Sequence, residues 1–220
     1  MLKRASGGIS APFSLAFLTD RRRLPNPEPV MRALPAGAAV IYRDYDDPRR
    51  EAMARRYRAL CAARNILFLV AGDAALARLV GADGLHLPAV MLRAARSDFP
   101  PPLAGEVSRS DGGAPLRHAA RDSSPVNGGA KRMRLLTAAC HGACELQLAA
   151  SAGANLALLS PVFATQSHPG ADYLGAAAFK ALAAASPLPV LALGGVDGEN
   201  ARLIAGKNVA GIAAIGAFTD

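Results

Sequence analysis

Short apolar runs alternate with longer segments of helical periodicity along most of the chain. The runs lie at 14–19, 38–43, 66–70, 84–87, 134–139, 155–159, 190–193 and 211–215. Apolar residues at helical spacing fill the intervals at 28–34, 48–64, 73–80, 89–96, 143–152, 176–185 and 198–205. Fully apolar runs are typical of strands buried on both faces of a parallel sheet. Repeated strand-then-helix order predicts an α/β fold, a closed (β/α)8 TIM barrel.

Two stretches depart from this alternation. Residues 97–132 contain a Pro run and paired glycines, carry mixed charges and show almost no apolar periodicity. We interpret them as a disordered surface insertion after the fourth helix, outside the core. At the other end, only residues 217–220 follow the last apolar run, so we expect no eighth helix. Something else must then cover that strand, and a partner subunit in a homodimer is one candidate.

Composition limits the class of protein further. The chain of 220 residues is 51% hydrophobic and 19% charged, which excludes wholesale disorder and a coiled coil and favours a single barrel over 1–220. No run approaches the roughly 20 apolar residues of a membrane span, and we expect no signal peptide. The cysteines lack paired spacing, so we expect a reduced, cytoplasmic protein.

The formal net charge of +8 raises the question of a nucleic-acid partner. The arginines between 49 and 58 spread around a predicted helix, without interleaved aromatics or a helix-turn-helix pattern. We therefore expect no nucleic-acid partner. An anionic small molecule or simple solubility explains the charge better.

Glycines follow the last two predicted strands. Gly194 and Gly195 come after the seventh, and Ile215 and Gly216 end the eighth. In (β/α)8 enzymes these two loops commonly bind phosphate, because glycines let backbone N–H groups approach an oxyanion and a helix N-terminus adds positive potential. The alternative is that the glycines only permit tight turns. The pairing of adjacent loops favours phosphate.

The long loop after the sixth strand carries Thr165, Ser167 and His168. Their hydroxyls and imidazole lie at the end of the barrel where such enzymes place active sites. These groups have an equally good alternative, which is to satisfy hydrogen bonds of their own loop.

His141 follows the fifth strand, and Arg43 ends the second. An imidazole exchanges protons near neutral pH, which suits an acid or base. A guanidinium at a strand end recognises oxyanions through paired hydrogen bonds. The alternatives are a helix-start histidine without function and an arginine paired with Asp44, Asp46 or Asp47.

Other histidines and cysteines give weaker signals. His86 lies within the fourth strand and is expected to pack in or near the barrel. His86, His141 and His168 come from separate segments without fixed spacing, which is a weak basis for a metal site. Cys140 is a weak nucleophile candidate, because nothing in the sequence indicates a positive setting around it.

Several short segments together resemble the thiamine-phosphate synthase/TenI family. They lie at 17–21, 81–87, 153–155, 161–163 and 193–196, in the family's order and on the expected elements. The resemblance implies a TIM barrel, usually dimeric, that binds a phosphorylated thiazole. Synthases of this family join the thiazole to an aminopyrimidine methyl pyrophosphate, and Mg²⁺ holds the leaving pyrophosphate.

The thiazole-phosphate side of that family's site looks kept here. Thr165 and Ser167 match its hydroxyl pair, and Gly195 matches its phosphate glycine. Ile215 and Gly216 match its last phosphate loop, although Gly216 replaces the usual Ser.

The metal and pyrophosphate side looks lost. Residues 41–45 keep only Arg43 of the family's Gln-x-Arg-x-Lys pattern. Residues 71–72 replace its Asn-Asp pair, with Asp73 one residue along. Met91 replaces its second metal-binding Asp, and His168 replaces the Lys of the strand-six loop. The comparison therefore predicts no cofactor, with Mg²⁺ needed only by a synthase.

TenI-like members resemble thiazole tautomerases, which shift a proton and need no metal. Their catalytic His follows the fifth strand, where His141 stands here, and Arg43 is a candidate for the substrate carboxylate. We expect such a tautomerase. A weak or altered thiamine-phosphate synthase and a non-catalytic regulator that binds a phosphorylated ligand are the alternatives.

Overall fold

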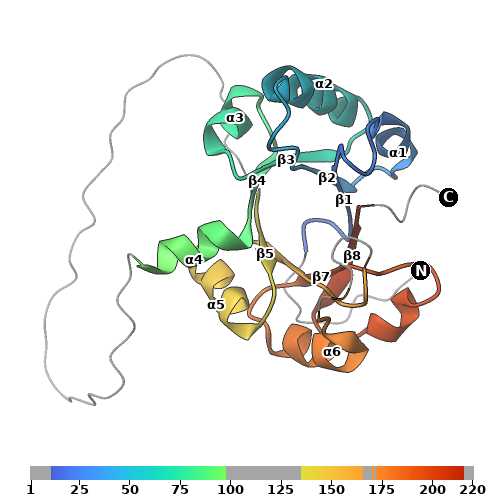
Figure 1. The fold of residues 1–220 in the computed structure, drawn as a ribbon, viewed down its shortest axis with the longest axis vertical. Coiled ribbons are helices and arrows are strands. Elements are labelled where there is room, and N and C mark those ends of the chain that lie inside the picture. The colour runs from blue at the N-terminus through green and yellow to red at the C-terminus, as the bar shows by residue number, and fades with distance from the viewer. Residues whose placement is uncertain (1–10, 98–134, 166–169, 171, 216–220) are drawn as a thin grey trace, which may run out of the picture.

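A computed structural model describes residues 11–97, 135–165, 170 and 172–215 of the chain. Within these residues, parallel strands pair in sequence order and close into a barrel, because the last strand pairs with the first (Figure 1). The predicted (β/α)8 TIM barrel is therefore confirmed. The strands are β1 Leu15–Leu18, β2 Ala39–Tyr42, β3 Leu67–Ala71, β4 Gly84–Leu87, β5 Leu135–Cys140, β6 Leu156–Leu159, β7 Val190–Leu193 and β8 Val209–Ala214.

Helices surround this barrel. Figure 1 shows α1 to α3 on one side and α4 to α6 on the other. Each helix follows a strand, and the apolar face that the sequence predicts packs on the outside of the sheet. The helices are α1 Glu28–Ala33, α2 Arg50–Ala63, α3 Ala74–Leu79, α4 Ala89–Ser97, α5 Ala143–Ser151, α6 Gly175–Ala185 and the short 3-10 helix η1 Ala201–Ile204.

Alternate strand residues face opposite sides of the barrel wall. In β2, Ala39 and Ile41 belong to the apolar cluster inside the barrel, whereas Val40 and Tyr42 pack against the helices. Every one of these four side chains is fully buried. Both faces of the strands are thus apolar, which explains why the sequence shows continuous runs rather than alternation. The interior cluster comprises Phe13, Ala16, Leu18, Ala39, Ile41, Leu69, Ala71, Leu156, Leu158, Leu191 and Ala213.

The prediction of a helix at 198–205 is wrong. The structure has only the 3-10 turn η1 there. Side chains before it hydrogen-bond the backbone instead: Asp197 Oδ1 accepts the N–H groups of Glu199 and Asn200, each at 2.9 Å. Such local bonds compete with helix formation, and Gly198 adds chain entropy that a helix must remove. The eighth strand also begins earlier than predicted, at Val209.

Two predictions concern segments outside the described residues. The predicted insertion at 97–132 is described only at Ser97, the last residue of α4. The residues after 215, on which the absence of an eighth helix depends, also lie outside. None of the helices in the described part of the chain has the length and apolar character that a membrane crossing requires.

Replacing Gly211 with Ala is expected to destabilise the closure of the barrel. A Cβ at Gly211 would lie 1.8 Å from the carbonyl oxygen of Ser14, and the backbone has φ +154°. The ladder between β1 and β8 would have to separate locally, which we expect to lower the free energy of unfolding by about 2 kcal/mol. Urea unfolding measures the effect. Gly206→Ala is the matched control, because its nearest neighbours are side-chain atoms of Lys180 at 3.5 Å; equal stability of the two variants would contradict the prediction.

Candidate active site

Candidate residues from separate parts of the chain gather at one end of the barrel. Because the strands are parallel, their carboxyl ends form a single rim. Ser167, His168 and Gly216 were also expected at this rim, and they lie outside the described residues. The described candidates that follow the strands are Arg43, His141, Thr165, Gly194, Gly195 and Ile215.

The ring of His141 has a defined orientation after β5. Its Nδ1 lies 2.8 Å from the carbonyl oxygen of Ser160, which follows β6. A carbonyl oxygen only accepts hydrogen bonds, so Nδ1 carries the proton and the lone pair of the neutral ring is on Nε2. The ladder between β5 and β6 reaches this point, since the N–H of Ser160 donates to the oxygen of Cys140 at 3.0 Å. His141 is exposed, so its Nε2 is suited to take a proton from a ligand.

Glu145 holds the chain at His141 in place. It is buried in the first turn of α5, and its carboxylate accepts the backbone N–H of His141. The same carboxylate accepts a hydrogen bond from Arg93 Nε of α4 at 2.6 Å. These bonds satisfy an N–H at the start of a helix and fix the direction in which the strand leaves the sheet.

A hollow of about 480 Å³ borders His141. Its walls come from the end of β5 and from α4 and α5, so it lies on the helix side of the rim. The hollow leaves open space beside the imidazole. Its lining residues are Arg93, His141, Gly142, Cys144, Glu145 and Leu148.

The glycines after β7 pack directly on the loop after β6. A Cβ at Gly195 would lie 2.3 Å from the carbonyl oxygen of Ala164, and the backbone has φ +65°. The N–H of Phe163 donates to the oxygen of Gly194 at 3.0 Å. The two loops are therefore held together, which places Thr165 beside the glycine turn.

The N–H groups of this turn are suited to an oxyanion. No hydrogen bond between described residues uses the N–H of Gly195 or Val196. Asn200 Nδ2 donates to the carbonyl oxygen of Gly195 at 2.8 Å and fixes the peptide from the other side. The helix N-terminus expected to assist here is only η1, so a phosphate at this turn would be bound by backbone N–H groups rather than by a helix dipole.

Arg43 binds a different partner from those the sequence suggested. Its Nη2 lies 3.0 Å from Asp20, and its Nε donates to the carbonyl oxygen of Thr19 at 3.1 Å. Arg43 thus joins the ends of β1 and β2. Its guanidinium is already hydrogen-bonded, which weakens its candidacy as the carboxylate-binding residue.

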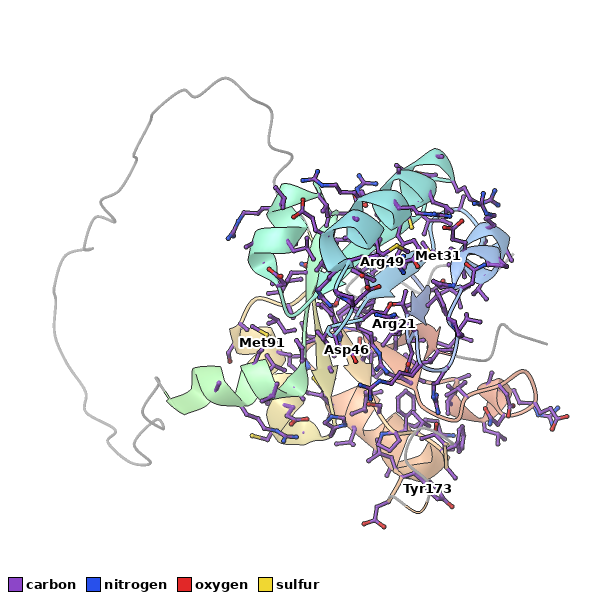
Figure 2. The ribbon with its side chains drawn as sticks, turned by 45° about the horizontal axis from the view of Figure 1, so that its top comes forward. Arg21, Met31, Asp46, Arg49, Met91 and Tyr173 are labelled. Atoms are coloured by element: carbon purple, nitrogen blue, oxygen red, sulfur yellow. The ribbon has the colours of Figure 1, made fainter. Side chains whose placement is uncertain are left out.

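The acidic residues after β2 pair with the arginines after β1. Asp44 accepts the N–H of Arg21 at 2.8 Å, and Asp47 lies 3.2 Å from the Arg21 guanidinium. Asp46 pairs with Arg22 at 2.7 Å. Figure 2 shows Arg21 and Asp46 on these two loops. The basic residues of this segment are therefore partly neutralised by the chain itself.

His86 lies inside the barrel, as expected. It is buried, and its Nδ1 lies 2.9 Å from the hydroxyl of Thr137 on β5. Burial and, to a smaller extent, the positive charge of Arg43 together lower the pKa of His86 to about 4. The imidazole is therefore neutral in the folded protein at neutral pH.

This burial predicts a loss of stability in acid. The unfolded chain binds a proton on His86 below pH 6.5, whereas the folded chain resists it until about pH 4. The contribution is fully present above pH 6.5 and is lost as the pH falls through this window, by about 2 kcal/mol near pH 4.5. Urea unfolding near pH 7 and near pH 4.5 tests this, with His86→Asn as the comparison. An equally steep acid dependence in the variant would contradict it.

Cys140 is unsuited to nucleophilic chemistry. It is fully buried, and burial raises the pKa of its thiol to about 12. The thiolate form required of a nucleophile is therefore strongly disfavoured.

The described residues do not fit the Mg²⁺ site that the family resemblance implies. Asp73 caps α3, because its carboxylate accepts the N–H of Leu76 at 2.8 Å. Met91, at the position where the family resemblance implies the second carboxylate, lies on α4 and is exposed (Figure 2). Gly72 stands where the resemblance implies the Asp of the Asn-Asp pair, and a Cβ there would lie 3.2 Å from the ring of Tyr45. Mg²⁺ prefers carboxylate and other oxygen ligands, and Met91 supplies none at this position.

Sequence reasoning missed several residues that shape the site. Ser160 provides its backbone carbonyl, which no side-chain pattern reveals. Asn200 was assigned to a helix, although the spacing Asp197-x-x-Asn200 is typical of a local turn. The sequence pattern spreads Arg50 and its neighbouring arginines around a helix, but the guanidinium of Arg50 reaches the carbonyl oxygen of Ala71 at the end of β3.

Comparison with known proteins identifies relatives of the whole barrel. A family model described as thiamine monophosphate synthase matches residues 15–100 and 116–218. A thiamine-phosphate synthase of Acidithiobacillus ferrooxidans is 30% identical, over 91% of this chain and 84% of the relative. One from Alcanivorax borkumensis is 31% identical, over 96% of this chain and 84% of the relative.

A solved structure shares the fold. The thiamine phosphate pyrophosphorylase from Pyrococcus furiosus superposes with a TM-score of 0.64 at 23% identity, covering 93% of this chain and 86% of that one. The relatives and the family model cover the strands that carry the candidate site. The chain therefore belongs to the thiamine monophosphate synthase/TenI family of thiamine biosynthesis.

Proposed function

We propose that this protein is a metal-independent tautomerase acting on a thiazole phosphate carboxylate. The observation that carries the proposal is the orientation of His141. Its Nδ1 donates to the Ser160 carbonyl at 2.8 Å, which leaves Nε2 as the base at the rim of the barrel. An imidazole whose free nitrogen is Nε2 suits a reaction that only moves a proton.

The reaction needs one group that both takes and returns a proton. Nε2 of His141 removes a proton from a carbon of the partly saturated ring, and the imidazolium returns a proton elsewhere as the ring becomes aromatic. The Ser160 carbonyl stabilises the imidazolium, because it accepts from Nδ1 in both states. Atoms and electrons balance without a further reactant.

The phosphate of the substrate anchors the ring for this step. The backbone N–H groups of Gly195 and Val196 are suited to the phosphate oxygens, and Thr165 lies on the neighbouring loop. Holding the phosphate fixes the distance between the reacting carbon and the base, which supplies much of the rate enhancement in such reactions.

A thiamine-phosphate synthase is the second candidate, because the relatives at 30% identity carry that name. Displacing pyrophosphate requires compensation of the leaving charge. Asp73 is engaged as a helix cap, and Met91 offers no oxygen. Loss of these ligands and of the family's lysines is expected to lower a synthase rate about a thousandfold or more.

The test measures isomerisation and condensation with the same preparation. With thiazole phosphate carboxylate in the presence of EDTA, the proposal predicts catalytic conversion to the aromatic isomer. Proton NMR in deuterated water measures this conversion. Adding the aminopyrimidine pyrophosphate and Mg²⁺ should yield thiamine phosphate only at a trace rate. Condensation at an efficient rate, with no isomerisation in EDTA, would establish the synthase instead.

A further inference from the structure

Arg50 has an unusual environment at the rim of the barrel. It is the first residue of α2, and its Nη2 donates to the carbonyl oxygen of Ala71 at 2.8 Å. Its guanidinium carbon lies 5.2 Å from the ring centroid of Tyr42 and 5.1 Å from that of Tyr45. Two aromatic rings and one carbonyl therefore hold the cation at the ends of β2 and β3.

One nitrogen of this guanidinium has no partner. Nη1 of Arg50 is buried and makes no hydrogen bond within the described part of the chain. A buried N–H on a charged group destabilises the fold unless an acceptor reaches it. An anionic acceptor would relieve this cost and form a charge-assisted hydrogen bond.

Tyr45 is the outer of the two rings. Tyr42 is fully buried in the core, whereas Tyr45 is 55% exposed and packs near Gly72 and Pro88. Of the two rings that contact the Arg50 guanidinium, Tyr45 is therefore the one that borders solvent. A rotation of this exposed side chain would uncover Nη1 without disturbing the core.

A second arginine acts at the same place. Arg43 and Arg50 both counteract the effect of burial, which raises the pKa of the Tyr45 hydroxyl. Arg43 is already bonded to Asp20 and Thr19. The positive charge of both residues attracts an anion, and Arg50 has the N–H group left to bind it.

We propose that Arg50 binds the carboxylate of the substrate and that Tyr45 is the movable cover over this subsite. This inference rests on the proposed function and names the side chain that recognises the second anionic group. In the proposed function the phosphate binds at the glycine turn after β7, so the two anionic groups of one ligand would be held at separate parts of the rim. Arg50 thus selects for carboxylated substrates.

Calorimetric binding of two probes tests the proposal: thiazole phosphate with its carboxylate and the same compound without it. The wild-type protein is expected to prefer the carboxylated probe by about tenfold. Arg50→Gln should abolish that preference and keep the affinity for the probe without carboxylate, which also reports that the variant is folded. Arg49→Gln removes the same charge from a neighbouring exposed arginine and should keep the preference (Figure 2).

Tyr45→Ala provides a second, independent test that leaves Arg50 in place. It should raise the affinity for the carboxylated probe severalfold and leave the other probe unchanged. A preference that survives Arg50→Gln, or that disappears in Tyr45→Ala, would overturn the proposal. If Arg50→Gln does not fold, Tyr45→Ala alone decides.

Failure of the proposed function gives a different result. A protein that shows the Arg50-dependent preference without isomerising the substrate would be a carboxylate-selective binder rather than a tautomerase. Isomerisation with equal binding of the two probes would overturn only the role of Arg50. Absence of binding by either probe would overturn both.

Discussion

Replacing His141 with Asn is expected to lower the isomerisation rate about a thousandfold while the affinity for thiazole phosphate stays within about twofold. The imidazole is the proposed proton carrier, and general acid–base catalysis contributes about 10²–10⁴ to rates of this kind. Asn can still donate to the Ser160 carbonyl, which now accepts from Nδ1 at 2.8 Å, so the loop should keep its position. Single-turnover kinetics and calorimetry measure the two quantities separately.

The matched control is Gln147→Ala, an exposed residue further along α5. It should leave both rate and affinity unchanged. A His141 variant that isomerises at the wild-type rate would remove His141 from the mechanism. A wild-type protein that binds the ligand but never isomerises it would favour the non-catalytic regulator.

Replacing Gly195 with Ala is expected to weaken thiazole-phosphate binding by at least about tenfold and to destabilise the fold by roughly 2–3 kcal/mol. The added Cβ would lie 2.3 Å from the oxygen of Ala164 and 2.9 Å from backbone and side-chain carbon atoms of Phe163, at a backbone φ of +65°. Either the loop after β6 or the glycine turn itself must move, which displaces the N–H groups of Gly195 and Val196 that we propose bind the phosphate. Calorimetry gives the affinity, and urea unfolding gives the stability.

Gly198→Ala, in the same segment, separates this effect from a general loss of flexibility. A Cβ at Gly198 meets no atom within 4 Å. The control should therefore bind and unfold like the wild type. Unchanged phosphate affinity in the Gly195 variant would place the phosphate elsewhere on the rim.

The barrel itself could be predicted because its strands are buried on both faces. Runs such as the one that became β2 are apolar at every position, and both the interior and the helix layer require this. Closure then follows from the number and order of such runs. The segment at 198–205 could not be predicted in the same way, because its Asp197 and Asn200 side chains bond the local backbone and override a weak helical pattern.

For the candidate site, the sequence predicts which residue types follow the strands, but not the backbone and side-chain partners that orient them. His141 could be placed at the rim from its position after a strand, but its tautomer depends on the Ser160 carbonyl, which is a backbone atom. The pairing of Arg43 with Asp44, Asp46 or Asp47, which the sequence suggested as an alternative, is wrong for a related reason, because Arg43 pairs with Asp20. Asp20 is far away in sequence and adjacent only because β1 and β2 pair.

The most direct test of the account is calorimetric titration of thiazole phosphate and of the aminopyrimidine pyrophosphate, each with and without Mg²⁺. We expect thiazole phosphate to bind with the same affinity in both conditions and the pyrimidine pyrophosphate to bind in neither. That result would leave proton transfer at His141 as the chemistry that the site supports. Mg²⁺-dependent binding of the pyrimidine pyrophosphate would contradict the account and show that Asp73 or another residue supplies the metal site after all.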